Sequence, residues 1–232
     1  MKLTILYEDA DVVVVAKPAG LITHSDGRTK EETTEDWFKG KYPDGAGYVH
    51  RLDRDTSGAL VFAKNATAYE FLRKSFHDRE VKKTYLAFVY GVPNEKKGVI
   101  NFDIGRSRRD FRLRSAQPKA KGRLREALTR YEVIGETNGY ALLKVTPETG
   151  RTHQIRAHLK AIHHPIIGDP LYSPNKPLAL GINRMGLHAY QIDLQIPSGR
   201  RMIITAPIPS DLAAAFAHFP EVKKFALVHD EC

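Results

Sequence analysis

An unbroken apolar run near the start of the chain, Val12-Val13-Val14-Val15, constrains the fold more than any other feature. Successive side chains of a strand point to opposite faces of its sheet, so this strand is apolar on both faces. A strand of that kind has to lie in the middle of a sheet, covered on both sides. The Pro18-Ala19-Gly20 turn that follows ends the strand, since Pro and Gly interrupt regular structure.

Further strand-like runs recur along the chain and alternate with a few helical segments. Strands are predicted at 59–63, 83–90, 128–134, 140–146, 187–194 and 201–206. Helices are predicted around 30–41, after a cap at Asn65, after 150–156 and after a cap at Ser210. Consecutive strands with interspersed helices predict an α+β fold with a mixed, largely antiparallel sheet and flanking helices. With no repeat and no dividing linker, residues 1–232 are expected to form a single domain.

The number of cysteines and the lengths of the apolar runs indicate in which compartment the protein is expected to work. Cys232 is the only cysteine, so the chain has no internal disulfide or cysteine metal site, which fits a reducing compartment. No apolar run reaches the length of a membrane span. The first residues lead directly into acidic ones and do not read as a signal peptide. We therefore expect a soluble, cytoplasmic protein.

Positive charge is concentrated in one segment, residues 106–125, which we call the basic arm. It holds nine Lys or Arg residues and one Asp, hence a net charge of +8 in a chain of +9. One basic arm on a nearly neutral body indicates a grip on a polyanion. The alternative is a solvated loop, and composition alone does not separate RNA from DNA or a membrane surface. The arm is expected to be either a two-stranded excursion or a mobile loop that orders on RNA.

A charged loop precedes the strand at 59–63 and reads His50-Arg51-Leu52-Asp53-Arg54-Asp55-Thr56-Ser57-Gly58. A neighbouring arginine favours the ionised form of an aspartate, so this loop can present a carboxylate as a nucleophile or base. The plain alternative is a surface loop with solvated charges and an ordinary Asx or Thr turn.

Three other chemistries find little support in the sequence. Histidines gather at His153, His158, His163 and His164, but the first two diverge round a helix, so no metal site is expected. Ser57 lacks the Gly-x-Ser-x-Gly elbow of many hydrolases and precedes a strand rather than a helix. No glycine pattern typical of nucleotide binding appears, so no nucleotide cofactor is expected.

The charged loop resembles the signature of the RluA-type pseudouridine synthases, in which seven of these nine positions are fixed. Further blocks similar to that family follow the same order along the chain. They are Lys17-Pro18-Ala19-Gly20, Arg79-x-Val81-x-Lys83-x-Tyr85, Gly150-Arg151-Thr152-His153-Gln154-Ile155-Arg156, Gly168-Asp169 and Leu187-His188-Ala189. The chain departs from many members at Gln195-Ile196-Pro197, where they have His-Pro.

The resemblance implies roles for particular residues. The aspartate matching Asp53 is catalytic, the tyrosine matching Tyr85 packs against the target uracil, and the arginine matching Arg156 pairs with the aspartate. The arginine matching Arg51 fills the gap left by the flipped base. Without the resemblance, Tyr85 would be an ordinary strand tyrosine and Arg156 a solvated helix arginine.

The resemblance also implies a pseudouridine-synthase-like sheet with flanking helices and a central RNA-binding cleft, and a reaction without a cofactor. A separate N-terminal RNA-binding module of the kind that many relatives carry is not evident. The remaining candidates for RNA contact are Arg108, Arg109, Arg112, Arg114, Arg151 and His153.

The leading hypothesis is a monomeric RNA pseudouridine synthase that acts on ribosomal or transfer RNA. One alternative is an RNA-binding or RNA-folding protein on the same scaffold whose pocket is idle. Another is a glycosylase, which would also flip a base but would release free uracil.

Overall fold

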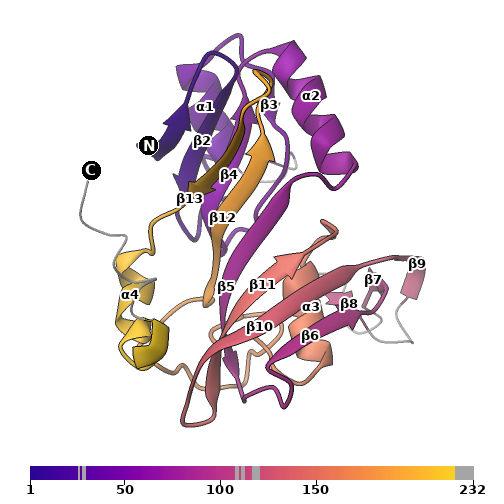
Figure 1. Cartoon of the computed structure of the whole chain (residues 1–232), viewed down its shortest axis with the longest axis vertical. Coiled ribbons are helices and arrows are strands. Elements are labelled where there is room, and N and C mark those ends of the chain that lie inside the picture. The colour runs from indigo at the N-terminus through magenta and orange to yellow at the C-terminus, as the bar shows by residue number, and fades with distance from the viewer. Residues whose placement is uncertain (26, 28–29, 108–109, 111–112, 117–120, 223–232) are drawn as a thin grey trace. The chain divides into compact units, whose positions relative to one another are not determined.

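The structure, a computed structural model, describes residues 1–25, 27, 30–107, 110, 113–116 and 121–222. The chain forms two compact units that are interleaved in sequence (Figure 1). Unit 1 consists of Met1–Lys83 and Ala189–Pro207, and unit 2 of Thr84–His188 and Ile208–Cys232. The chain passes between the units within strands β5 (Lys82–Tyr90) and β12 (Leu187–Gln195), and again after Pro207. That the whole chain acts as one catalytic domain stays a prediction.

Unit 1 is a sheet with two helices. Its neighbouring strands run in the order β1-β2-β4-β12, with β13 beside β12 and β3 beside β4. The elements are β1 (Thr4–Glu8), β2 (Val12–Lys17), α1 (Thr34–Lys41), β3 (Gly47–Tyr48), β4 (Ser57–Ala63), α2 (Ala66–His77) and β13 (Arg201–Thr205). The β1–β2, β2–β4, β3–β4 and β12–β13 pairs are all antiparallel.

The central apolar strand lies where its sequence predicts. Residues Val12–Val15 of β2 are all fully buried, between β1 and β4. Val12 and Val14 belong to a core cluster with Leu72 of α2. On β4, the ring of Phe62 stacks on Phe38 of α1, with 4.7 Å between the ring centroids. Helices therefore supply the cover that an all-apolar strand requires.

Local capping signals set where the helices of unit 1 begin. The predicted cap at Asn65 is confirmed, because its side chain accepts a hydrogen bond of 2.8 Å from the Ala68 N–H. Helix α1 begins with a capping box, in which Thr33 and Asp36 each bond the other's backbone N–H.

Unit 2 is built around a second run of strands in the order β5-β11-β10-β6, all paired antiparallel. Its other elements are β6 (Lys97–Asn101), β10 (Leu128–Thr137), β11 (Tyr140–Pro147), α3 (Gln154–Ala161), α4 (Ser210–Phe216) and the 3₁₀ turn η1 (Pro220–Val222). An Asn138-Gly139 turn joins β10 to β11, and both residues have positive φ, as two-residue hairpin turns require. Ser210 begins α4 but does not cap it, because Pro209 occupies the cap position.

Helix α3 packs against β10 and β11, as Figure 1 shows. Gln154 at its first turn donates to the Leu128 carbonyl and the Thr129 hydroxyl of β10. At α4, the ring of Phe216 meets Phe88 of β5 edge to face, at 5.3 Å. The expected α+β fold with largely antiparallel pairing is confirmed, whereas the RNA-binding cleft stays a prediction.

The described part of the basic arm belongs to a small three-stranded sheet in the order β8-β7-β9. Strands β8 (Arg114–Ser115) and β9 (Lys121–Arg125) lie within the arm, and β7 (Ile104–Arg106) reaches it at Arg106. That the arm orders on RNA stays a prediction. Among the residues that the structure describes, no helix has the length and apolarity needed to cross a membrane.

Candidate active site

A buried lysine fixes the loop that carries Asp53. The side chain of Lys17, at the end of β2, is 1% exposed. Its ammonium donates to the carbonyl oxygens of Pro18 (2.9 Å), Leu21 (2.6 Å) and Arg54 (2.9 Å). A buried ammonium needs such acceptors, and one of them is the carbonyl directly after Asp53. Lys17 therefore ties the loop to the end of the central strand.

The backbone on the other side of Asp53 is fixed by a threonine. The Thr23 hydroxyl donates to the Leu52 carbonyl at 2.8 Å, and the Leu52 N–H reaches the same hydroxyl at 3.2 Å. The Thr56 N–H closes the turn on the Asp53 carbonyl at 3.1 Å. The half-buried Asp53 thus stands on a segment that is bound on both sides, not on a freely solvated loop.

His50 at the start of the loop is a structural, uncharged side chain. Its Nε2 accepts a hydrogen bond of 3.1 Å from the Val61 N–H of β4, and its ring stacks on Phe76 of α2. Burial, with a smaller contribution from the Lys83 charge, lowers the pKa of His50 to about 3. The imidazole is neutral at neutral pH and anchors the loop to the sheet.

The other two predicted catalytic residues lie in unit 2. Tyr85, on β5 opposite Val145 of β11, is 9% exposed. Arg156 of α3 is 3% exposed and forms a two-pronged ion pair with Asp169, with Nε–Oδ2 at 2.7 Å and Nη2–Oδ1 at 2.9 Å. The alternative of a solvated helix arginine is therefore wrong. Asp53 belongs to unit 1, and its pairing with Arg156 stays a prediction.

Asp169 and Tyr172 are functional candidates to which no role was assigned from the sequence. The Asp169 carboxylate, besides holding Arg156, accepts the backbone N–H groups of Leu171 (2.9 Å) and Tyr172 (3.0 Å). The Tyr172 ring faces the guanidinium of Arg156, whose central carbon lies 5.0 Å from the ring centroid. Asp169 and Arg156 each lie in a block noted in the sequence, but nothing in the sequence indicated that these two residues, 13 apart, form an ion pair.

The predicted RNA contacts are spread over both units. Arg51 is exposed on the loop of unit 1. In unit 2, Arg151 donates from Nε to the Glu126 carbonyl at 3.0 Å, and Arg114 lies on β8, half-buried. His153 has left-handed backbone (φ 55°) directly before α3. Arg108, Arg109 and Arg112 lie outside the described residues.

The histidine cluster does not gather round one point. His158 is fully buried between the Thr129 hydroxyl and the Phe102 carbonyl, each 2.9 Å from a ring nitrogen, and burial lowers its pKa. His164 lies 3.1 Å from the Tyr90 carbonyl. Within the described ranges, no three side chains of His, Cys, Asp or Glu are placed to hold a metal ion.

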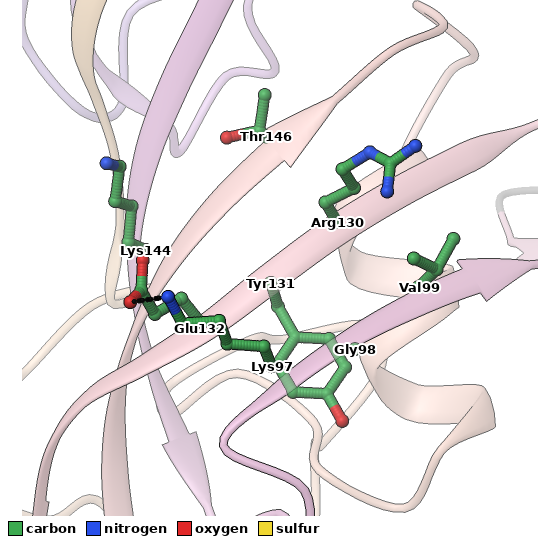
Figure 2. Close-up of a pocket in the computed structure, with 8 residues that line it drawn as sticks. All are labelled: Lys97, Gly98, Val99, Arg130, Tyr131, Glu132, Lys144 and Thr146. Carbon is green, nitrogen blue, oxygen red and sulfur yellow. Dashed lines mark ion pairs between the residues drawn. The ribbon is translucent and has the colours of Figure 1, made fainter.

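A hollow of about 370 Å³ lies on strands β6, β10 and β11 (Figure 2). Its charged groups are largely compensated, since Lys97 pairs with Glu132 at 2.8 Å and Arg130 pairs with Glu148. It is lined by Lys97, Gly98, Val99, Arg130, Tyr131, Glu132, Lys144 and Thr146. None of the predicted site residues lines it, so we assign it no part in the site.

Comparison with known proteins identifies the family. Residues 11–161 match the family described as RNA pseudouridylate synthase, which is more than half of the chain. The chain belongs to this family. The matched stretch contains the charged loop with Asp53, the strand with Tyr85 and the whole of helix α3 with Arg156.

Individual members of the family support the assignment. An uncharacterised RNA pseudouridine synthase of Chloroflexus aurantiacus is 43% identical over 84% of this chain and 63% of its own length. The ribosomal large subunit pseudouridine synthase D of Nitrosomonas europaea is 38% identical over 91% of this chain and 64% of its own. This chain thus spans somewhat less than two thirds of the length of these two relatives.

Two solved human structures have the same fold. Human RNA pseudouridylate synthase domain containing 1 superposes with a TM-score of 0.75 at 27% identity, covering 90% of this chain and 84% of its own. Human RNA pseudouridylate synthase domain containing 4 superposes with a TM-score of 0.74 at 26% identity, covering 93% and 92%. The pseudouridine-synthase-like fold that the sequence indicated is therefore confirmed.

Proposed function

We propose that this chain is an RNA pseudouridine synthase that isomerises uridine to pseudouridine in ribosomal or transfer RNA. The match to the family over residues 11–161, which includes Asp53, carries the proposal. The relative from Nitrosomonas named for the ribosomal large subunit favours ribosomal RNA as the first substrate to try. A monomeric, cytoplasmic enzyme without a nucleotide cofactor completes the proposal.

The reaction rearranges bonds without a net change in composition. The bond from the ribose carbon 1′ to uracil N1 breaks, and a bond from carbon 1′ to uracil carbon 5 forms. Carbon 5 loses its proton and N1 gains one. A carboxylate can attack the sugar or the ring, or remove a sugar proton, and each route requires Asp53 in its ionised form. A loop fixed by Lys17 and Thr23 holds that carboxylate in one place.

Arg156 and Tyr85 have complementary parts in this proposal. A guanidinium beside Asp53 would favour its ionised form, and Asp169 holds Arg156 in a single orientation for that purpose. The aromatic face of Tyr85 would keep the detached uracil from leaving. The target base has to leave its stack first, which costs a few kcal/mol. Phosphate contacts of the basic arm would offset that cost.

The test is release of tritium from RNA labelled at uracil carbon 5, with ribosomal and transfer RNA supplied separately. Wild type should release tritium from one of the two, and Asp53→Asn should release none while still binding the RNA. Asp55→Asn, two residues away in the same loop, is the matched control and should stay active. Release by Asp53→Asn at the wild-type rate would refute the role of Asp53.

Two further outcomes would replace the proposal with one of the alternatives. Free uracil among the products would mean that the enzyme is a glycosylase. RNA binding with no release from either substrate would favour a binding protein with an idle pocket.

A further inference from the structure

The hydroxyl of Tyr172 holds the base of the basic arm. It accepts a hydrogen bond of 2.8 Å from the Arg114 N–H of β8 and lies 3.2 Å from the carbonyl oxygen of the same residue. The Nδ1 atom of His153, directly before α3, lies 3.3 Å from the same hydroxyl. One oxygen therefore joins a backbone position of the arm to the start of the helix that carries Arg156.

The ring of Tyr172 lies in a small core shared by the arm and the helix. Tyr172 is 6% exposed and packs with Ile104 of β7, Ala157 of α3, Ala116 and Ala127. Contacts between α3 and β8 continue this packing. The arm strands are thus fastened to α3 through a buried apolar cluster with Tyr172 in it.

Tyr172 also contacts two residues of the candidate active site, Arg156 and Asp169. Its ring faces the Arg156 guanidinium at 5.0 Å, which is within the range of a cation–π interaction. Its backbone N–H donates to Asp169, the same carboxylate that holds Arg156. Displacing Tyr172 would therefore disturb two groups that contact the Arg156 guanidinium, the Tyr172 ring and the Asp169 carboxylate.

We propose that Tyr172 is a positioning residue that couples the basic arm to Arg156. Its hydroxyl sets the arm and its ring supports the arginine, so a phosphate chain gripped by the arm is held in a fixed relation to the catalytic arginine. The proposal rests on the proposed function, because it assigns the arm to RNA and Arg156 to the reaction. The role of the hydroxyl can be tested apart from the role of the ring, since Tyr172→Phe removes the hydroxyl and keeps the ring.

The first test uses no RNA, so it does not depend on the proposed function. Amide hydrogen exchange of the segment 113–116 should be about fivefold faster in Tyr172→Phe, since the Arg114 N–H loses its acceptor. Tyr90→Phe is the matched control, because that hydroxyl bonds the Pro177 carbonyl at 2.6 Å and Lys176 lies over its ring. It should leave 113–116 unchanged. Equal exchange in wild type and Tyr172→Phe would overturn the proposal.

The second test separates RNA binding from the chemical step. In single-turnover reactions, Tyr172→Phe should raise the RNA concentration at half-maximal rate about fivefold and leave the maximal rate within twofold. Tyr172→Leu, which also removes the ring beside Arg156, should lower the maximal rate at least tenfold. A wild-type half-maximal concentration in Tyr172→Phe would mean that the arm is not coupled through this hydroxyl.

The two tests fail in different ways. Wild-type enzyme that releases no tritium would refute the proposed function and not the exchange result. Faster exchange at 113–116 with unchanged kinetics would refute the coupling and leave the proposed function standing. Phenylalanine keeps the ring and the backbone, so this variant decides the question even if Tyr172→Leu fails to fold.

Discussion

At the scale of single residues, Lys17 shows how a charged side chain can serve as structure. Its ammonium is out of contact with water and bonds three carbonyl oxygens, one of them in the loop that carries Asp53. In the sequence it ends a strand and opens one of the family-like blocks, with no partner indicated. Its tie to the loop depends on the carbonyl of Arg54, 37 residues later, and the sequence pattern does not indicate that contact.

We predict that Lys17→Met destabilises the protein by about 2–4 kcal/mol, because three carbonyl oxygens lose a charged donor whose side chain is buried. Unfolding in urea measures this. Lys39→Met is the control, since that side chain is 61% exposed and forms an ion pair with Glu35 one helical turn away. It should cost less than about 0.5 kcal/mol. Equal losses in the two variants would mean that the three carbonyl contacts contribute little.

The neutral His50 predicts a pH dependence of stability. Its folded pKa of about 3 lies below the ordinary value of 6.5, so the unfolded chain binds a proton first as the pH falls. Stability contributed by this group is complete above pH 6.5 and is lost as the pH falls toward 3. The slope from one such group is at most about 1.4 kcal/mol per pH unit.

The check is urea unfolding at pH 7.5, 6 and 5 for wild type and His50→Asn. The variant should be less stable at pH 7.5, having lost the contacts with Val61 and Phe76. The gap between the two proteins should narrow as the pH falls. A constant gap would show that His50 titrates alike in the folded and unfolded chains.

At the scale of elements, the pairing of β4 with β12 depends on a glycine. A Cβ on Gly58 would lie 2.2 Å from the Ala189 carbonyl oxygen, and its φ of 121° disfavours any other residue. Backbone atoms of a buried strand cannot give way as a flexible side chain can.

We predict that Gly58→Ala costs more than about 3 kcal/mol and that Gly40→Ala does not. Gly40 lies in α1 with open space around it and no positive φ, so alanine there should gain up to about 1 kcal/mol. Thermal unfolding compares the two variants. A mild effect of Gly58→Ala would imply that β12 can shift relative to β4.

Strands, caps and turns were easier to predict than side-chain hydrogen bonds, because the former depend on residues that are close in sequence and the latter join residues that are far apart. The buried run at Val12–Val15, the Asn65 cap and the Asn138-Gly139 turn each depend on residues that are neighbours in sequence. The hydrogen bonds of Thr23 with Leu52, of Lys17 with Arg54 and of Tyr172 with Arg114 join residues 29, 37 and 58 apart. Side-chain pattern alone carries no information on such partners.

At the scale of the whole molecule, nearly all of the net positive charge lies in one segment of the chain. The basic arm holds a net +8 of the total +9. If it makes roughly six phosphate contacts with single-stranded RNA, the logarithm of the affinity should fall with the logarithm of salt at a slope near −4.

We predict that replacing Arg108, Arg109, Arg112 and Arg114 together by Gln weakens RNA binding and flattens that slope by up to about 2.8. Binding isotherms at several salt concentrations measure this. The control replaces Lys97, Arg130 and Lys144 around the hollow on β6, β10 and β11, which should change the slope little because Lys97 and Arg130 are already paired with glutamates. If the replacements around the hollow flattened the slope more than those in the arm, the phosphates would be bound at the hollow and not at the arm.

The interleaving of the two units has a consequence for synthesis on the ribosome. Strand β4 is made early, but β12, which pairs with it beside Gly58 and Ala189, follows only after roughly 130 more residues, a loop whose closure costs about 4 kcal/mol. At about 5–20 residues per second, the part of β4 around Gly58 stays without this partner strand for roughly 7 to 26 seconds. A nascent chain with an open strand edge is a target for chaperones and for mispairing. The order of translation, and not only the final stability, therefore bears on how much active protein a cell obtains.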